Sequence, residues 1–139
     1  MAGIARRGLI CADTSSLIAH LAGEQGLDVE LIRKALVDGS LVLAPVAVSE
    51  LLSDPELPPS LEGFVLDLPQ LDIIPGYWER AGKLRARLIR HRLRPKLADT
   101  LIAQSCIDHE VSLVTRDRDF STFQKFAGLQ LLCPQGRVQ

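Results

Sequence analysis

The sequence is poor in aromatic residues, and its positive and negative charges nearly cancel. Aromatic side chains make up 4% of the 139 residues, although hydrophobic residues of all kinds make up 47%, and the formal net charge is −1. The core is therefore expected to be built from Leu, Ile, Val and Ala, as in aliphatic α/β packing. The total charge argues neither for nor against a nucleic-acid partner. No apolar run approaches the roughly 20 residues that cross a bilayer, so no membrane-spanning segment is expected.

Cysteine is also scarce, and the residues present lie far apart. Cys11, Cys106 and Cys133 are an odd number and form no C-x-x-C pair, so the spacing typical of a zinc site is missing. Cys11 and Cys106 fall in apolar segments, where a free cysteine packs as a small core residue. These features predict a reducing, cytoplasmic location.

Short apolar runs alternate with segments whose apolar residues have helical spacing. The runs typical of strands are residues 9–12, 41–44, 71–74 and 111–114, and residues 129–132 are expected to form an edge strand. The longest predicted helices, residues 77–93 and 97–110, are separated by Pro95, which breaks a helix. This alternation predicts an α/β fold: a three-layer α/β/α sandwich with a mainly parallel, roughly five-stranded central sheet. The length fits a single domain over residues 1–139, with a core of about residues 8–133.

The first apolar run ends at an acidic residue. Residues 9–12 carry no charge, which suits a strand buried on both faces, and Asp13 follows them directly. Residues 14–16, Thr-Ser-Ser, are expected to cap the following helix, and Asp28 is expected to cap the next one. Asp13 alone would be an ordinary cap or turn residue. It stands, however, at the carboxyl end of a strand, which is the edge where open α/β sheets bind ligands.

Further acidic residues follow the same pattern. Glu50 lies at the border of the apolar stripe of the helix after the second predicted strand. Asp99 lies in the first turn of its helix, where the helix dipole favours a carboxylate by about 0.3–1 kcal/mol. Asp117 and Asp119 lie in a polar turn directly after the fourth predicted strand. Each position has an ordinary explanation, but together they place four acidic positions at one edge of the sheet.

Such a group of acids indicates a metal site. Crowded carboxylates repel one another, and their pKa values rise unless a cation neutralises them. Oxygen ligands suit magnesium or manganese rather than zinc. A site of this kind orients a phosphodiester, lowers the pKa of an attacking water and stabilises the leaving oxygen. His20, His91 and His109 are scattered, so no Ser-His-Asp or Cys-His arrangement competes with this interpretation.

Four segments carry a family resemblance when they are taken in order. They are Asp13-Thr14-Ser15, Ser49-Glu50-Leu51-Leu52, residues 98–103 (ADTLIA) and residues 115–120 (TRDRDF). This order resembles a PIN-domain ribonuclease, and most of all the VapC toxins of bacterial and archaeal toxin–antitoxin pairs, over nearly the whole chain. The resemblance implies a parallel sheet sandwiched by helices and a magnesium-dependent endoribonuclease, with manganese as a possible substitute. It also implies an RNA substrate, an inhibitory antitoxin and a homodimer.

The resemblance also implies roles for individual residues. Carried over by motif, Asp13 and Asp99 are the principal metal ligands, and Glu50 and Asp117 complete the acidic catalytic site, with Asp117 also a metal ligand. The polar residues that support them are Ser15, Thr115 and Asp119. Because Asp117 and Asp119 are both acidic, either can be the fourth carboxylate, and Asp117 is preferred because it is nearer the strand end. One metal and two metals both remain open.

The basic residues are concentrated in one segment. Half of the 16 Lys and Arg residues fall in the 17 positions from Arg80 to Lys96, and no acidic residue lies among them. A one-sided run of this kind favours a polyanion as partner. Because the run leads directly into Asp99, its end is placed to hold an RNA backbone over the metal site, and an acidic antitoxin segment is an alternative occupant. The residues expected to contact RNA or the antitoxin are Arg85, Arg87, Arg90, Arg92, Arg94 and Lys96.

Other functions fit the sequence less well. A phosphoacceptor receiver domain needs paired acids after the first strand and a later Lys, and a haloacid-dehalogenase-type phosphatase needs a second Asp where Ser15 stands. Two alternatives stay open: an RNA-binding PIN-like module without nuclease activity, and an RNA-processing nuclease outside a toxin–antitoxin pair. The intact set of four acids favours the nuclease.

Overall fold

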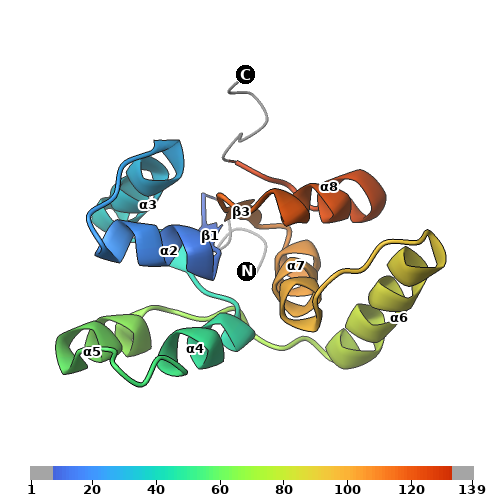
Figure 1. The fold of residues 1–139 in the computed structure, drawn as a ribbon, viewed down its shortest axis with the longest axis horizontal. Helices are drawn as coiled ribbons and strands as arrows, with labels where there is room; N and C mark the ends of the chain where they lie inside the picture. The colour runs from blue at the N-terminus through green and yellow to red at the C-terminus, as the bar shows by residue number, and fades with distance from the viewer. Residues whose placement is uncertain (1–7, 133–139) are drawn as a thin grey trace.

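A short parallel sheet lies at the centre of the molecule. The structure, a computed structural model that describes residues 8–132, contains β1 (Ile10–Ala12), β2 (Leu41–Val42) and β3 (Ser112–Val114) in the order β2–β1–β3. Figure 1 shows β1 and β3 at the centre, with helices around them. Both pairings of β1 are parallel. Parallel neighbours need a crossover between them, and helices supply it here. The predicted parallel α/β architecture is confirmed.

Single bridges widen the sheet on both sides. Leu43, just beyond β2, pairs in parallel with Gln70, and Leu113 of β3 pairs in parallel with Leu131. The two predicted outer strands are each reduced to this contact. After Leu71 the chain leaves the sheet, and the next two residues, Asp72 and Ile73, are exposed.

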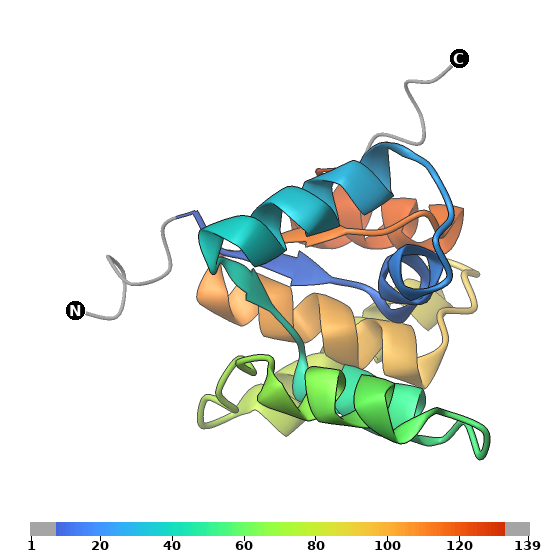
Figure 2. The same cartoon turned by 90° about the vertical axis from the view of Figure 1, so that its left-hand side faces the viewer.

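Helices cover both faces of the sheet. In Figure 2 the strands lie between α3 above and α7 below, which is the three-layer arrangement that the sequence predicts. The helices are α2 (Thr14–Leu21), α3 (Leu27–Asp38), α4 (Pro45–Leu52), α5 (Pro59–Asp67), α6 (Tyr77–Arg90), α7 (Leu97–His109) and α8 (Ser121–Ala127), with a 3₁₀ turn, η1 (Arg118–Phe120), before α8.

Successive residues of β1 point into two different apolar cores. Cys11 packs in a cluster with Ile102 of α7 and Phe123 of α8, whereas Ala12 packs with Leu17 of α2 and Ile32 of α3. Strand side chains alternate between faces, so a strand without charge needs helices on both sides. The sheet is therefore held from both faces, and only its strand ends are left for a site.

The two cysteines of the described region behave as predicted. Cys11 and Cys106 are buried and free, and Cys133 lies outside the described residues. Among the helices between residues 8 and 132, none combines the length and the apolar character needed to cross a membrane.

Two predicted helix caps are wrong, and both differences concern acidic residues. Asp13 itself caps α2 and accepts a hydrogen bond from the Ser15 N–H, while residues 14–16 form the first turn. The cap of α3 is Gly26, and Asp28 lies in the first turn of that helix. The Asp28 carboxylate instead accepts hydrogen bonds from side chains outside α3, as described below.

Candidate active site

Three aspartates converge beside the N-terminal end of α7. Asp99 lies in the first turn of α7, Asp117 caps η1, and Asp119 lies within η1. One carboxylate oxygen from each residue lies within 4.8 Å of the others, close enough for the three to ligate one cation. Sequence analysis preferred Asp117 to Asp119, whereas the fold brings both to Asp99, because the tight turn of η1 leaves their side chains on the same side.

Asp13 lies at the end of β1 and is almost completely buried, with 2% of the residue exposed. Its Oδ2 atom accepts hydrogen bonds from Ser15 Oγ at 2.6 Å and Thr115 Oγ1 at 2.9 Å. Burial raises the pKa of Asp13, and these hydrogen bonds offset only part of that effect. The two hydroxyl groups therefore fix the orientation of a carboxylate whose ionised form is disfavoured without a counter-charge.

Asp99 is the most strongly perturbed acid of the group. The residue is 9% exposed, and its pKa rises from an ordinary value of 3.8 to about 7, through burial first and then the charges of Asp13 and Asp117. Lys96 lowers this pKa, and Glu50 raises it. At neutral pH the Asp99 carboxyl is divided between protonated and ionised forms. A cation bound nearby would favour the ionised form.

Glu50 joins the group from α4, on the exposed side. Partial burial and the charge of Asp13 raise its pKa, and its Oε1 atom accepts a hydrogen bond from Thr14 Oγ1 at 3.4 Å. Thr14 thus links two of the acids, a contact that sequence analysis missed because residue 14 reads as an ordinary helix cap. Asp13, Glu50 and Asp117 all raise the pKa of Asp99 through their charges, so these four acids interact electrostatically in the fold.

The loop after β3 is organised by the hydroxyl group of Thr115. This hydroxyl donates to Asp13 and accepts a hydrogen bond from the backbone N–H of Asp117 at 2.9 Å. The Asp117 Oδ1 atom in turn accepts from the backbone N–H of Asp119 at 2.9 Å. A chain of short-range bonds therefore runs from Asp13 through Thr115 to both aspartates of the loop.

A pocket of about 180 Å³ opens beside the three aspartates. Asp99 and Asp119 line it with carboxylates, and Arg94 and Lys96 line it with positive charge. The remaining lining residues are Leu93, Pro95, Thr122 and Phe123. Carboxylates, cations and an apolar surface thus meet in one cavity, which suits a ligand with anionic and apolar parts, such as a nucleotide.

The basic segment divides between two faces. One groove is lined by Arg80, Lys83, Arg87 and Arg90 of α6 together with residues of α7 and α8. A second hollow is lined by Arg85, Ile89, Arg92, Leu93 and Arg94, and it shares Leu93 and Arg94 with the acidic pocket. Within α6 the helical period of 3.6 residues turns Arg85 and Ile89 away from the first group, whereas residues 92–94 follow the end of the helix. Arg85 and Arg87 also donate to the backbone carbonyls of Pro95 and Phe126, at 3.0 Å each.

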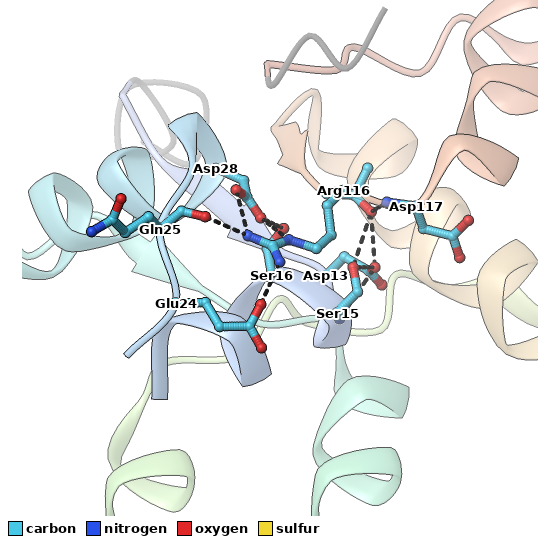
Figure 3. A network of polar contacts seen from close by, with 9 residues as sticks. Asp13, Ser15, Ser16, Glu24, Gln25, Asp28, Arg116 and Asp117 are labelled. Carbon is cyan, nitrogen blue, oxygen red and sulfur yellow. Dashed lines mark hydrogen bonds and ion pairs between the residues drawn. The ribbon is translucent and has the colours of Figure 1, made fainter. Parts of the chain in front are cut away.

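Sequence analysis also missed an ion pair next to the acids. Arg116 binds Asp28, and in Figure 3 its side chain extends away from Asp117 toward the start of α3. The alternating charges of residues 116–119 look like a solvated turn in the sequence, and Asp28 looks like a helix cap. Only the packing of this turn against α2 and α3 brings the two residues together.

Several solved structures share this fold. DNA-bound VapBC from Salmonella typhimurium contains a chain that matches with a TM-score of 0.69 and 19% identity, over 89% of this chain and 96% of that one. For VapBC2 from Rickettsia felis, bound to a promoter DNA fragment, the TM-score is 0.67 at 18% identity, over 89% and 97%. For VapBC-5 from Mycobacterium tuberculosis the TM-score is 0.62 at 19% identity, over 88% of this chain and 96% of that one.

The sequence itself supports the same assignment. No curated protein matches the chain significantly. The PIN domain family, in contrast, matches residues 10–126, a span that begins at β1 and includes Asp13, Glu50, Asp99 and Asp117. The family resemblance noted in the sequence is thereby confirmed, and the chain belongs to the PIN domain family.

Proposed function

We propose that the protein is a metal-dependent endoribonuclease that hydrolyses RNA phosphodiester bonds as the toxin of a toxin–antitoxin pair. The observation that carries this proposal is the convergence of acids from four separate segments at the strand ends of a PIN fold. PIN domains of VapC toxins are nucleases, and VapBC proteins share the fold of this chain.

The donor set fits a hard divalent cation. Three carboxylates lie within 4.8 Å of one another, and the raised pKa of Asp99 reflects burial and repulsion that a cation would relieve. Asp99, Asp117 and Asp119 would hold Mg²⁺ or Mn²⁺, with Asp13 as the fourth acid, because oxygen ligands suit these ions. The bound ion would supply a more acidic water and stabilise charge on the phosphate.

The surrounding residues have separate tasks in this proposal. Ser15 and Thr115 hold the Asp13 carboxylate in place through its Oδ2 atom. Glu50, the most exposed of the four predicted acids and one with a raised pKa, is suited to accept a proton from the attacking water at its carboxylate. Arg94 and Lys96, which line the pocket next to Asp99, would neutralise the phosphates of the RNA.

The same surface suggests the protein partners. An antitoxin would inhibit by covering the acidic pocket or by occupying the basic residues near it, and a homodimer would follow the habit of VapC-like proteins. Both partners would meet the toxin in the cytoplasm, where Cys11 and Cys106 stay reduced. An RNA-binding module without activity, or an RNA-processing nuclease without an antitoxin, remains the alternative.

RNA cleavage with and without the metal tests this function. Purified protein incubated with a mixed RNA pool is expected to cut it in MgCl₂ or MnCl₂ and to stop in EDTA, with activity restored by excess metal. Binding of RNA without cleavage under all metal conditions would support the module without activity. Cleavage that persists in EDTA would contradict the metal-dependent mechanism. In cells, expression of the protein is expected to be toxic, and co-expression of its antitoxin is expected to relieve that toxicity.

A further inference from the structure

Arg116 lies between two residues of the site but extends in the opposite direction. Its neighbours, Thr115 and Asp117, contact Asp13 and the aspartate group, whereas the guanidinium reaches the start of α3 (Figure 3). Nε and Nη2 donate to Asp28 Oδ2 and Oδ1 at 2.7 and 3.0 Å. Nη1 donates to Glu24 Oε1 at 2.7 Å, and Nη2 also donates to the Gln25 carbonyl at 3.2 Å.

The partner of Arg116 is a buried charge. Asp28 is 3% exposed, and Ser16 Oγ also donates to its Oδ2 atom at 2.7 Å. Burial by itself raises the pKa of Asp28, but hydrogen bonds from Arg116 and Ser16 and the charge of Arg116 together hold it below its ordinary value. A planar, bidentate Arg–carboxylate pair of this kind contributes geometric specificity as well as electrostatic energy. The pair therefore joins the loop after β3 firmly to α2 and α3.

The backbone before α3 is shaped around this contact. Gly26 has a φ of 148°, and a Cβ atom there would lie 2.6 Å from Asp28 Oδ1 and 3.1 Å from Arg116 Nη2. Glycine is thus required where the loop passes the ion pair. The close approach also places the Gln25 carbonyl within reach of Arg116.

The aspartate group needs such an anchor. Oxygens of Asp117 and Asp119 lie within 4.8 Å of an Asp99 oxygen, and like charges at this distance repel one another when no cation is bound. The Thr115 hydroxyl holds the inner end of the loop at Asp13, and the Arg116 fork holds the adjacent residue at Asp28. Together they fix the backbone on the side of Asp117 that precedes η1.

We propose that Arg116 and Asp28 are positioning residues that hold Asp117 at the aspartate group and thereby set the affinity of the site for a divalent cation. This inference rests on the proposed function, because it concerns the same metal site. For the loss of Arg116, the proposal predicts a change in cation affinity opposite to the change that charge alone predicts. Removal of a nearby positive charge would strengthen cation binding by electrostatics, whereas loss of the anchor weakens it.

Calorimetric titration of the full chain with MnCl₂, without RNA, measures this effect directly. Arg116→Gln is expected to weaken Mn²⁺ binding at least about tenfold, the scale seen when residues that orient metal ligands are lost. Asp28→Asn, which changes a residue distant in sequence from the aspartates, is expected to weaken binding in the same direction. The double variant is expected to lose little more than either single variant, because both remove one anchor.

Arg80 offers a matched control elsewhere in the fold. It donates through Nε and Nη2 to Asp108 and through Nη1 to the Pro75 carbonyl, beside Gly76. The Arg and Asp side chains are 42% and 8% exposed there, against 34% and 5% for the Arg116 pair. Asp108 is about 13 Å along α7 from Asp99, given a rise of about 1.5 Å per residue. Arg80→Gln is expected to change Mn²⁺ affinity less than about twofold.

Each outcome decides between the two proposals. If the wild type binds Mn²⁺ and Arg116→Gln binds it equally or more tightly, the anchor is wrong and the proposed function stands. If Arg80→Gln weakens binding as much as Arg116→Gln, the effect reflects general stability, and the anchor is again wrong. A wild type that binds no Mn²⁺ overturns the proposed metal site and this inference together. If Arg116→Gln does not fold, Arg116→Lys carries the comparison, because it keeps the charge but cannot bind both Asp28 oxygens with a planar fork, so weaker Mn²⁺ binding supports the anchor and unchanged binding overturns it.

Discussion

Thr115 and Asp13 are separated by 102 residues in the sequence, and the Thr115 hydroxyl donates a 2.9 Å hydrogen bond to the Asp13 carboxylate. This contact joins the ends of β3 and β1, which are neighbours in the sheet. The same hydroxyl accepts a hydrogen bond from the Asp117 backbone N–H. One buried side chain thus sets the relative position of two acids that lie far apart in the chain.

Replacement of Thr115 tests this relationship. Thr115→Val keeps the shape but removes the hydroxyl, so Asp13 loses a donor and its pKa is expected to rise further. The loss should lower stability by about 1–3 kcal/mol, because the buried Asp13 carboxylate loses one of its donors and the Asp117 N–H loses its acceptor. RNA cleavage should fall about 10–100-fold, as for other residues that orient metal ligands. Thr115→Ser, which keeps the hydroxyl, should retain most of the activity, and equal rates in the two variants would contradict this role.

Asp99→Asn separates the chemistry of the site from its fold. The variant keeps the size of the side chain but removes a charge, so cleavage should fall at least about 100-fold, the scale of losing a preorganised electrostatic group. RNA binding should persist, because phosphate contacts come mainly from Arg and Lys. Asp67→Asn, on the exposed surface of α5, is the control and should cleave at the wild-type rate. A folded Asp99→Asn protein with the wild-type rate would falsify the mechanism.

The raised pKa of Asp99 gives the metal-free protein a pH dependence of definite sign. Between its ordinary pKa of 3.8 and its folded value of about 7, folding takes up a proton. The free energy of unfolding should therefore fall as pH rises through this interval and change little from this source above it. Asp99→Asn removes this proton uptake. As pH rises across the interval, the free energy of unfolding of the variant should therefore increase relative to that of wild type, by on the order of 2–4 kcal/mol.

Urea unfolding in EDTA across this pH range measures that difference. A difference between wild type and Asp99→Asn that stays constant with pH would mean that Asp99 has no raised pKa. In the presence of Mg²⁺ the difference should shrink at neutral pH, because the ion stabilises the ionised wild-type carboxyl by binding the folded state.

The division of the basic segment predicts which face binds RNA. The hollow lined by Arg92 and Arg94 shares residues with the acidic pocket, whereas the groove lined by Lys83 and Arg90 does not. Arg92→Gln combined with Arg94→Gln should therefore weaken RNA binding and reduce the salt dependence by about 0.7 log unit per lost phosphate contact. Lys83→Gln combined with Arg90→Gln is the matched comparison, with a smaller expected effect. Filter binding at several salt concentrations measures the RNA affinity of both double variants. A larger loss for the Lys83 and Arg90 variant would place the RNA on the other face.

The sequence determined the architecture and the identity of the acids. Uncharged runs such as residues 9–12 require burial on both faces, so the alternation of strands and helices was readable without the fold. The positions of Asp13 and Asp99 were readable as well, because Asp13 follows a strand and Asp99 lies in the first turn of a helix, and Glu50 was readable at the border of an apolar stripe. The outer strands were overestimated, since the residues after Leu71 are exposed and the chain leaves the sheet there.

Only the tertiary structure decided how these acids are held and how strongly they interact. Whether Asp119 joins Asp117 depends on the turn of η1, and the pKa of Asp99 depends on burial and on charges from other segments. Asp28 reads as a helix cap, yet it pairs with Arg116 across 88 residues because α3 packs beside the loop after β3. Local propensity acts within a few residues, whereas burial and charge pairing depend on distances that exist only after the chain has folded.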